Sequence, residues 1–252
     1  MKAQFKKVKR WAEAIIGLSL VWNRGSNYEI QADDVFLASY PRSGNTYLRW
    51  LLSSYLYSES VDFVNMRLFI PDVLTYYGVK KAYHSNSKPK ILKTHLPFNV
   101  RMNKVIYVVR DPRDVAYSWY KYKNPNNENT LDHFMDHFIN KSTLYGTWQE
   151  NVMSYCGRGL ENDKVLFVKY EDLVLHPKDV LIKICQFLNS PIDDDKMDKA
   201  IEKCSKRKMA KEYRENQGAA KMINFFENGI TEEHRNLIET EFSLGMNIFN
   251  YN

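Results

Sequence analysis

Residues Val35 to Leu52 read VFLASYPRSGNTYLRWLL, and this stretch decides how the chain folds. It begins with a continuous apolar run, which is typical of a strand covered on both faces of a sheet. Tyr40 and Pro41 end the run, a turn follows, and apolar residues then return with the spacing of a helix. Because the first N–H groups of such a helix point into the turn, the pattern predicts a P-loop-like, phosphate-binding turn.

The turn also carries side chains suited to an anion. Arg42 brings a full positive charge, and Ser43, Asn45 and Thr46 bring side-chain donors. An ordinary strand-to-helix turn, with Ser43 or Asn45 as the helix N-cap, would use the same residues. The turn alone therefore leaves both interpretations open.

The turn differs from the Walker A loop of nucleoside triphosphate-binding proteins, which reads Gly-x-x-x-x-Gly-Lys followed by Ser or Thr. Ser39 stands where the first glycine belongs, and Asn45 stands where the lysine belongs. The cation, Arg42, precedes Gly44 instead of following it. A nucleotide-dependent phosphotransferase is therefore an alternative with less support.

Three further runs are rich in β-forming residues, and helical patterns separate all four. The expected strands are Asp34–Tyr40, Lys90–His95, Lys104–Arg110 and Lys164–Tyr170. The expected helices are Thr46–Tyr57, a long region 130–156 interrupted near Gly146, one that starts at Pro177, and one that starts at Thr231. Alternating strands and helices predict a single α/β domain over residues 1–252, with a central, mostly parallel sheet between two helical layers.

Ligands of open α/β sheets bind outside the carboxyl ends of the strands. The residues at or just past these ends are Arg42–Thr46, Lys93–His95, Arg110–Arg113 and Tyr170–Asp172, and the first three segments carry basic or histidine side chains. We therefore expect these four segments to meet at one edge of the sheet.

The second motif is VIYVVRDPRDVAYSWYKY, from Val105 to Tyr122. Arg110 ends a buried strand, and Ser118 lies on the helix that follows. A guanidinium fork and a hydroxyl at this spacing could bind one phosphate together. The alternative is a strand-end Arg110 that pairs with Asp111 or Asp114.

The composition limits the classes of partner. The chain has 252 residues, a net charge of +6 and a pI of about 9.0, which suits an anionic ligand, a membrane surface or nucleic acid. Nucleic-acid binding is not expected, because the basic residues form no stripe with interleaved aromatic residues. Cys156, Cys185 and Cys204 match no zinc or redox spacing and indicate free thiols in a reducing, cytoplasmic compartment.

Two segments are set apart by their pattern. Residues 1–30 predict a basic amphipathic helix packed on the domain, and no stretch reaches the ~18 apolar residues of a membrane span, so stable membrane insertion is not expected. Contact of this helix with a membrane surface is a minor alternative. Residues 203–228 are basic, polar and weakly periodic, and they predict a mobile lid. The sequence leaves the oligomeric state open.

Taken together, the motifs resemble those of sulfotransferases that use 3′-phosphoadenosine 5′-phosphosulfate (PAPS), of the cytosolic and bacterial type. YPRSGNTY resembles their 5′-phosphosulfate loop, and YVVRDPRDVAYS resembles their 3′-phosphate site. LKTHLP resembles the segment with their catalytic histidine, and YGTW and VKYEDL also match. The five motifs stand in the family's order, and the resemblance spans roughly Val35 to Leu188.

The resemblance implies a role for each matching residue. The 5′-phosphosulfate would lie against Arg42, Ser43, Gly44, Asn45, Thr46 and Tyr47. Arg110 and Ser118 would hold the 3′-phosphate, and Tyr170 would contact the adenine. His95 would be the general base, with Lys93 and Arg42 as further catalytic residues. The protein would transfer a sulfuryl group from PAPS, in line, to a hydroxyl of a small-molecule acceptor, or with less support to an amine.

The chemistry of these side chains agrees with that reaction. An acceptor hydroxyl must lose its proton, and an imidazole with an ordinary pKa of about 6.5 suits this task. Charge develops on the leaving nucleotide, where the fixed cations Arg42 and Lys93 would stabilise it. No metal is required. The best rival metal site, His133 and His137, lacks the glutamate of a zincin helix and is expected to be a polar helix face.

The chain departs from the family pattern in two places. Arg42 stands where lysine is usual. In the closing segment, Gly229 and Thr231 are kept, but Glu227 and Asn228 replace the usual basic pair. Lost charge could come from cations in the expected lid, Arg207, Lys208, Arg214 or Lys221. A non-catalytic nucleotide-binding protein is therefore a second alternative. The acceptor would be selected by the variable stretches 60–88, 123–130 and 203–228.

Overall fold

The protein is described by a computed structural model that covers residues 28–57, 60–74, 89–124, 130–140, 143–159, 163–205 and 229–251. The expected N-terminal helix lies outside these residues, except that residues 28–30 are described and are not helical. The expected lid also lies outside them from residue 206 onward.

Four parallel strands form the sheet in the order β2-β1-β3-β4. They are β1 (Val35–Ser39), β2 (Ile91–Thr94), β3 (Lys104–Val109) and β4 (Val165–Lys169). In register, Val35 of β1 pairs with Ile91 on one side and Lys104 on the other. The four predicted strands and the parallel sheet are confirmed.

Successive residues of the inner strands point to opposite faces, and both faces are buried. In β1, Val35 and Leu37 belong to one apolar core, whereas Phe36 and Ala38 belong to the other. This double burial explains the continuous apolar runs, because each strand needs apolar residues on both of its faces.

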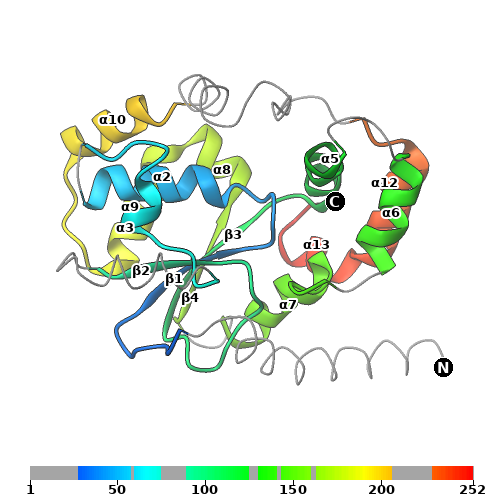
Figure 1. Ribbon diagram of the computed structural model, residues 1–252, viewed down its shortest axis with the longest axis horizontal. Helices are drawn as coiled ribbons and strands as arrows, with labels where there is room; N and C mark the ends of the chain where they lie inside the picture. Colours follow the sequence, from blue (N-terminus) through cyan, green and yellow to red (C-terminus); the bar gives the residue numbers. More distant parts are fainter. Residues whose placement is uncertain are drawn as a thin grey trace.

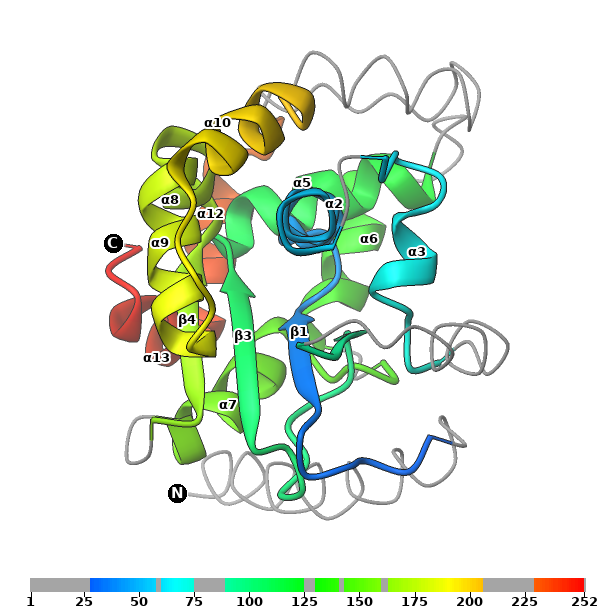
Figure 2. The ribbon, with the colours of Figure 1, turned by 90° about the vertical axis from the view of Figure 1, so that its left-hand side faces the viewer.

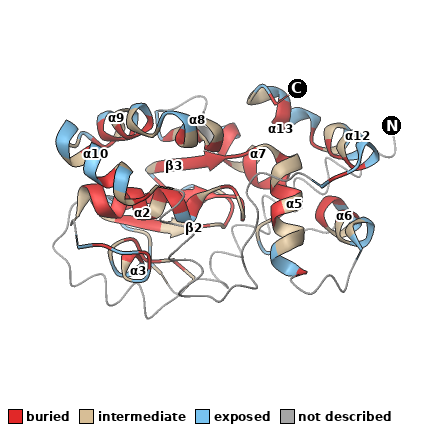
Figure 3. Ribbon diagram, turned by 90° about the horizontal axis from the view of Figure 1, so that it is seen from above, coloured by how far each residue is buried: buried red, intermediate tan, exposed pale blue. Residues whose placement is uncertain are grey.

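Helices cover the two faces and complete the three layers (Figure 1). The first core packs against α2 (Asn45–Leu56), α3 (Met66–Phe69), α8 (Tyr170–Leu175), α9 (Pro177–Leu188) and α10 (Asp194–Lys203). The second core packs against α5 (Pro112–Lys123), α6 (Leu131–Asn140), α7 (Trp148–Gly159), α12 (Glu232–Glu241) and α13 (Ser243–Ile248). Figure 3 shows buried residues concentrated at the centre of the molecule, in β3, α2 and α7, and exposed residues at its periphery, for example on α10.

The helix boundaries follow local signals in the sequence. The helix α9 begins at Pro177, as predicted, and ends at Leu188, and its C-cap Asn189 has a left-handed backbone. The side chain of Thr231 caps α12 by accepting a hydrogen bond from the N–H of His234. The long helical region breaks into α6 and α7 around Gly146, whose φ of 79° suits glycine.

Three strands lead at once into helices at the same edge of the sheet. β1 is followed by α2, β3 by α5, and β4 by α8, so three helix N-termini lie beside the carboxyl ends of the strands. Figure 2 shows β1 and β3 pointing toward the edge where α2 and α5 begin. In the described ranges, no helix is both long and apolar enough to cross a membrane.

Candidate active site

A cavity of 360 Å³ opens at this edge of the sheet. The described residues that line it include three cations, Arg42, Arg110 and Lys123, and no carboxylate. A surplus of fixed positive charge in a cleft attracts an anionic ligand. The full lining is Pro41, Arg42, Gly44, Asn45, Thr46, Tyr47, Phe63, His95, Arg110, Ser118, Trp119, Tyr122, Lys123, Tyr145 and Tyr170.

The cavity brings together nine of the eleven residues that the sequence assigned to the site. The nine are Arg42, Gly44, Asn45, Thr46, Tyr47, His95, Arg110, Ser118 and Tyr170. Ser43 and Lys93 are not among the described lining residues. The hydroxyl oxygen of Ser43 is buried and has no hydrogen-bond partner in the part of the chain that the structure describes.

The turn between β1 and α2 holds an unusual backbone. Gly44 is the N-cap of α2 with a left-handed φ of 98°, and no side chain caps the helix. The capping role considered for Ser43 or Asn45 is therefore not found. Because the first N–H groups of a helix have no intrahelical acceptor, they remain suited to an anion in the turn.

Asn45 fastens the start of α2 to the end of β1. Its amide nitrogen donates to the carbonyl of Leu37 and to the hydroxyl of Ser39, each at 3.2 Å. The amide fixes the direction in which α2 leaves the sheet, because both of its acceptors belong to the strand.

Gly44 and Arg110 both pack against Tyr170, the first residue of α8. A Cβ added to Gly44 would lie 2.2 Å from Cδ2 of Tyr170, so no larger residue fits there. The guanidinium carbon of Arg110 lies 4.6 Å from the centre of the same ring, within the range of a cation–π contact. The loop, β3 and α8 therefore meet on one aromatic ring.

Arg42 connects the turn after β1 to α5. Its Nε donates to the hydroxyl of Ser118 at 3.2 Å, and its guanidinium lies 4.7 Å from the ring centre of Tyr122. Its backbone is left-handed, with φ 69°. Such a conformation costs a non-glycine residue about 1–3 kcal/mol and is characteristic of functional loops.

Arg110 is buried and faces the loop. One guanidinium nitrogen donates to the carbonyl of Arg42 and another pairs with the carboxylate of Asp114, each at 3.3 Å. The ion pair considered as an alternative to phosphate binding therefore forms, with Asp114, and Arg110 lines the cavity as well. Its Nε is buried and unpartnered among the described residues, which leaves a donor unused.

His95 has a defined tautomer. Its Nδ1 lies 2.8 Å from the carbonyl oxygen of Ser39, and since a carbonyl only accepts, Nδ1 carries the proton. The lone pair therefore resides on Nε2. Burial lowers the pKa of His95 to about 3, and the positive charge of Lys93 acts in the same direction, so the imidazole is neutral at pH 7.

Lys93 is held by a partner that sequence reasoning missed. Its ammonium lies 2.5 Å from the carboxylate of Asp72, and the backbones of the two residues pair as a β-bridge. Burial favours the neutral carboxyl, but Lys93 holds the pKa of Asp72 below its usual range. The pair is therefore ionic, and the ammonium is directed at Asp72.

Asn151 on α7 was also missed. Its amide nitrogen donates to the carbonyl of His95 at 3.0 Å and to that of Tyr145 at 2.8 Å. The ring of Tyr145 lies 5.8 Å from that of His95. Asn151 therefore positions the backbone of His95 and of its aromatic neighbour. The nearby YGTW motif was the only signal in the sequence for this region.

The rival metal site consists of two side chains on α6, an exposed His133 and a half-buried His137. The rings of His133 and His137 lie 4.5 Å apart, and Nδ1 of His137 faces the carbonyl of His133. No group of three or more metal-ligating side chains occurs among the described residues. The compensating cations proposed for the closing segment, Arg207, Lys208, Arg214 and Lys221, lie outside those residues.

Comparison with known proteins identifies the family. The sulfotransferase domain model matches residues 32–246, which is more than half of the chain, so the chain belongs to this family. Sulfotransferase 1B1 of Canis lupus familiaris is 28% identical over 201 residues, which are 71% of this chain and 67% of the relative. Sulfotransferase 1C2 of Oryctolagus cuniculus is 29% identical over 210 residues, which are 75% of this chain and 69% of the relative.

Solved structures confirm the predicted fold. Mouse sulfotransferase SULT7A1, complexed with PAP, superposes with a TM-score of 0.68 at 21% identity and covers 90% of this chain and 88% of its own. Retinol dehydratase, in complex with androsterone and inactive cofactor PAP, gives 0.64 at 19% identity, with 88% and 83% covered. Both predictions, the P-loop-like α/β fold and the family, are confirmed.

We predict that Gly44→Ala destabilises the protein by about 2–4 kcal/mol, because it combines a left-handed backbone with a clash against Tyr170. The urea midpoint of unfolding measures this change. Gly157→Ala is the matched control, since a Cβ there meets nothing within 4 Å on a helix. A wild-type midpoint for Gly44→Ala would contradict the contact between the loop and α8.

We also predict a pH-dependent difference between wild type and His95→Asn. In the unfolded chain, His95 binds a proton below its ordinary pKa of about 6.5, whereas the folded chain keeps it neutral down to about pH 3. His95 therefore stabilises the fold fully above pH 6.5, and this contribution is lost as the pH falls. Between pH 7.5 and 5.5, the free energy of unfolding of wild type should fall by about 1.4 kcal/mol more than that of the variant.

Urea unfolding of both proteins at pH 7.5 and 5.5 measures this difference. The other histidines are common to both proteins and cancel in the comparison. An equal loss of stability in the two proteins would mean that folded His95 titrates at its ordinary pKa.

Proposed function

We propose that this sulfotransferase transfers a sulfuryl group from PAPS to a hydroxyl of a small-molecule acceptor, with His95 as the general base. One observation carries the proposal. A neutral His95, whose Nδ1 is committed to the carbonyl of Ser39, lines a cavity with three cations and no carboxylate among the described lining residues. A base beside an anion site is the arrangement that transfer from an anionic donor requires.

The donor set of the cavity fits a nucleotide with two anionic groups. Arg42 and the N-terminal turn of α2 would bind the 5′-phosphosulfate, and Arg110 with Ser118 would bind the 3′-phosphate. Tyr170 would contact the adenine. PAP bound to the mouse relative supports this choice of donor. The unused Nε of Arg110 and the buried hydroxyl of Ser43 also fit an anion-binding edge.

In the transfer, an acceptor oxygen attacks sulfur in line with the bond to the bridging oxygen. As the new S–O bond forms and the old one breaks, the acceptor proton passes to Nε2 of His95 and the bond electrons remain on the nucleotide phosphate. Arg42 would stabilise that charge. A nearby anion raises the pKa of an imidazole, which would bring His95 closer to the range useful for a base at pH 7.

Lys93 has a conditional place in this proposal. Its ammonium is paired with Asp72. To contact the transferring sulfuryl group, the ammonium would have to leave the carboxylate of Asp72 and bind the anionic donor instead. An acceptor would lie against the aromatic part of the lining, where Tyr145 packs on His95. Phe63, Trp119 and Tyr122 complete that part, which favours an acceptor with an apolar or aromatic portion.

We predict that His95→Ala lowers kcat by about 10²- to 10⁴-fold, because the acceptor proton loses its base. Binding of the bisphosphate product PAP should persist. The measurement is transfer from radiolabelled PAPS across an acceptor screen, with calorimetric titration of PAP. His133→Ala, on the exposed face of α6, is the matched control. Turnover near the wild-type rate in His95→Ala would remove His95 from the role of base.

We predict that Arg110→Ala weakens PAP binding by about 10- to 150-fold, because the loss of a charge-assisted contact costs roughly 1.5–3 kcal/mol. Arg101→Ala replaces an exposed arginine and serves as the control for the loss of one positive charge. Calorimetry measures both. An unchanged PAP affinity would refute the role of Arg110, and a preference for ATP with Mg²⁺ over PAP would favour a phosphotransferase.

A further inference from the structure

The peptide bond between Arg110 and Asp111, at the end of β3, is held by side chains on both sides. The indole N–H of Trp148 on α7 donates to the carbonyl of Arg110 at 3.2 Å. The N–H of Asp111 donates to a carboxylate oxygen of Glu171 on α8, also at 3.2 Å. The plane of this peptide is therefore fixed by two elements, one from each helical layer.

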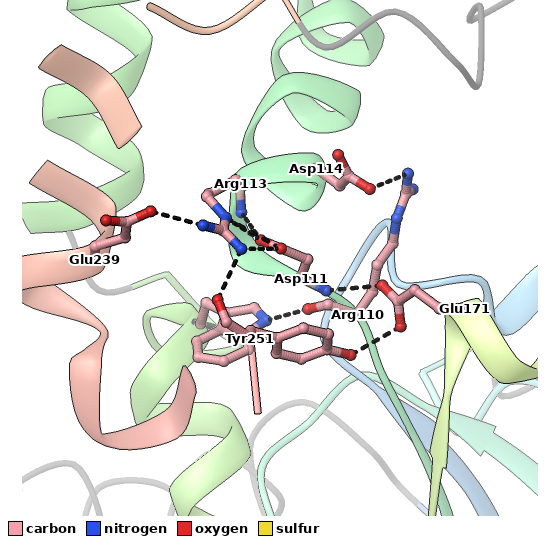
Figure 4. Close-up of polar contacts among 8 residues, drawn as sticks. Arg110, Asp111, Arg113, Asp114, Glu171, Glu239 and Tyr251 are labelled. Carbon is pink, nitrogen blue, oxygen red and sulfur yellow. Dashed lines mark hydrogen bonds and ion pairs between the residues drawn. The ribbon is translucent and has the colours of Figure 1, made fainter. Parts of the chain in front are cut away.

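Glu171 is itself held by the C-terminal segment. Its second carboxylate oxygen accepts a hydrogen bond from the hydroxyl of Tyr251 at 2.9 Å (Figure 4). Burial raises the pKa of Glu171. Burial also raises the pKa of Tyr251, and the negative charge of Glu171 acts in the same direction. The ammonium of Lys169 lies 4.5 Å from the ring centre of Tyr251, which gives the ring a second contact with the end of β4.

Arg113 binds the backbone of the same tyrosine. Its guanidinium donates to the carbonyl of Tyr251 at 2.7 Å and pairs with Asp111 and with Glu239 of α12, each at 2.6 Å. Tyr251 is thus held at its hydroxyl and at its carbonyl, and Figure 4 shows both contacts converging on the start of α5. The cluster joins α12 and the C-terminal segment to the residue that follows Arg110.

The orientation of this peptide determines where the side chain of Arg110 begins. Its guanidinium must reach the carbonyl of Arg42 and the ring of Tyr170. The carbonyl carbon of Arg110 belongs to this peptide, so a rotation of the peptide would change the angle at which its side chain leaves the backbone. Glu171 and Tyr251 are not among the described residues that line the cavity, so any effect on a ligand must pass through Arg110.

We infer that Glu171 and Tyr251 are positioning residues for Arg110, and that they fix its peptide so that the guanidinium meets a phosphate of the nucleotide. The inference rests on the proposed function, in which Arg110 binds the 3′-phosphate. A merely structural role for the cluster would lower the stability of the fold without a specific effect on the nucleotide.

The test is calorimetric titration of PAP into wild type, Tyr251→Phe, Arg110→Ala and the double variant. Tyr251→Phe removes only the hydrogen bond to Glu171, and we expect its Kd to rise about 3- to 10-fold. In the Arg110→Ala background, the same substitution should change the Kd by less than about 2-fold, because the group that it positions is gone. Glu171→Ala also removes the acceptor of the Asp111 N–H, so it should raise the Kd at least as much, and this effect should likewise disappear without Arg110.

Tyr55→Phe is the matched control. Tyr55 is also buried, and its hydroxyl donates to the carbonyl of Pro191 at 3.0 Å in the other core. We expect a similar fall in the melting temperature with an unchanged Kd. If PAP binds wild type, two results would overturn the positioning role. One is an unchanged Kd in Tyr251→Phe, and the other is an equal change in Kd when the substitution is made in wild type and in Arg110→Ala. No PAP binding by wild type would overturn the proposed function as well.

Discussion

The close packing of Gly44 on Tyr170 is the contact on which the candidate site depends. It brings the turn after β1 against the first residue of α8, which follows β4 on the far side of β3. Because Arg110 at the end of β3 packs on the same ring, three strand ends are brought to one point. A larger residue at position 44 would separate the loop from the ring, and the cavity would lose the wall that joins the turn after β1 to the end of β3.

The cations of the site are held in place by contacts of different kinds. Arg110 is buried, and its peptide and guanidinium both have fixed partners, so it resembles a preorganised electrostatic group. Lys93 is neutralised by Asp72, which lets an ammonium remain charged in a partly buried position. The cavity therefore presents its positive charge through Arg42, Arg110 and Lys123, and the charge of Lys93 is compensated within the protein.

The strands, the loop and the edge of the sheet could be predicted because their signals are local. The apolar run of β1 and the Gly44 turn lie within a few residues of each other, and the topology rule then places the strand ends together. Contacts between distant residues carry no such signal. Asp72 pairs with Lys93 and Asn151 holds His95 through side chains that no period or spacing connects. Tyr251 reaches Glu171 across 80 positions, and only the packed structure reveals that contact.

The arginine at position 42, where the family usually has lysine, has a geometric consequence. Its Nε binds Ser118, its carbonyl accepts from Arg110, and its guanidinium lies over Tyr122. A lysine carries its donors and its charge on one flexible ammonium and has no counterpart of Nε. It could not donate to Ser118 from partway along the side chain while its charged end packs on the ring of Tyr122. Arg42 thus connects the first motif to the second, across 76 positions of sequence, from a backbone that is already strained. We interpret it as a residue that holds the anionic donor in a fixed place, because a planar group with this many contacts has little freedom to move. A cation fixed in this way is already in position for the charge that develops on the leaving nucleotide.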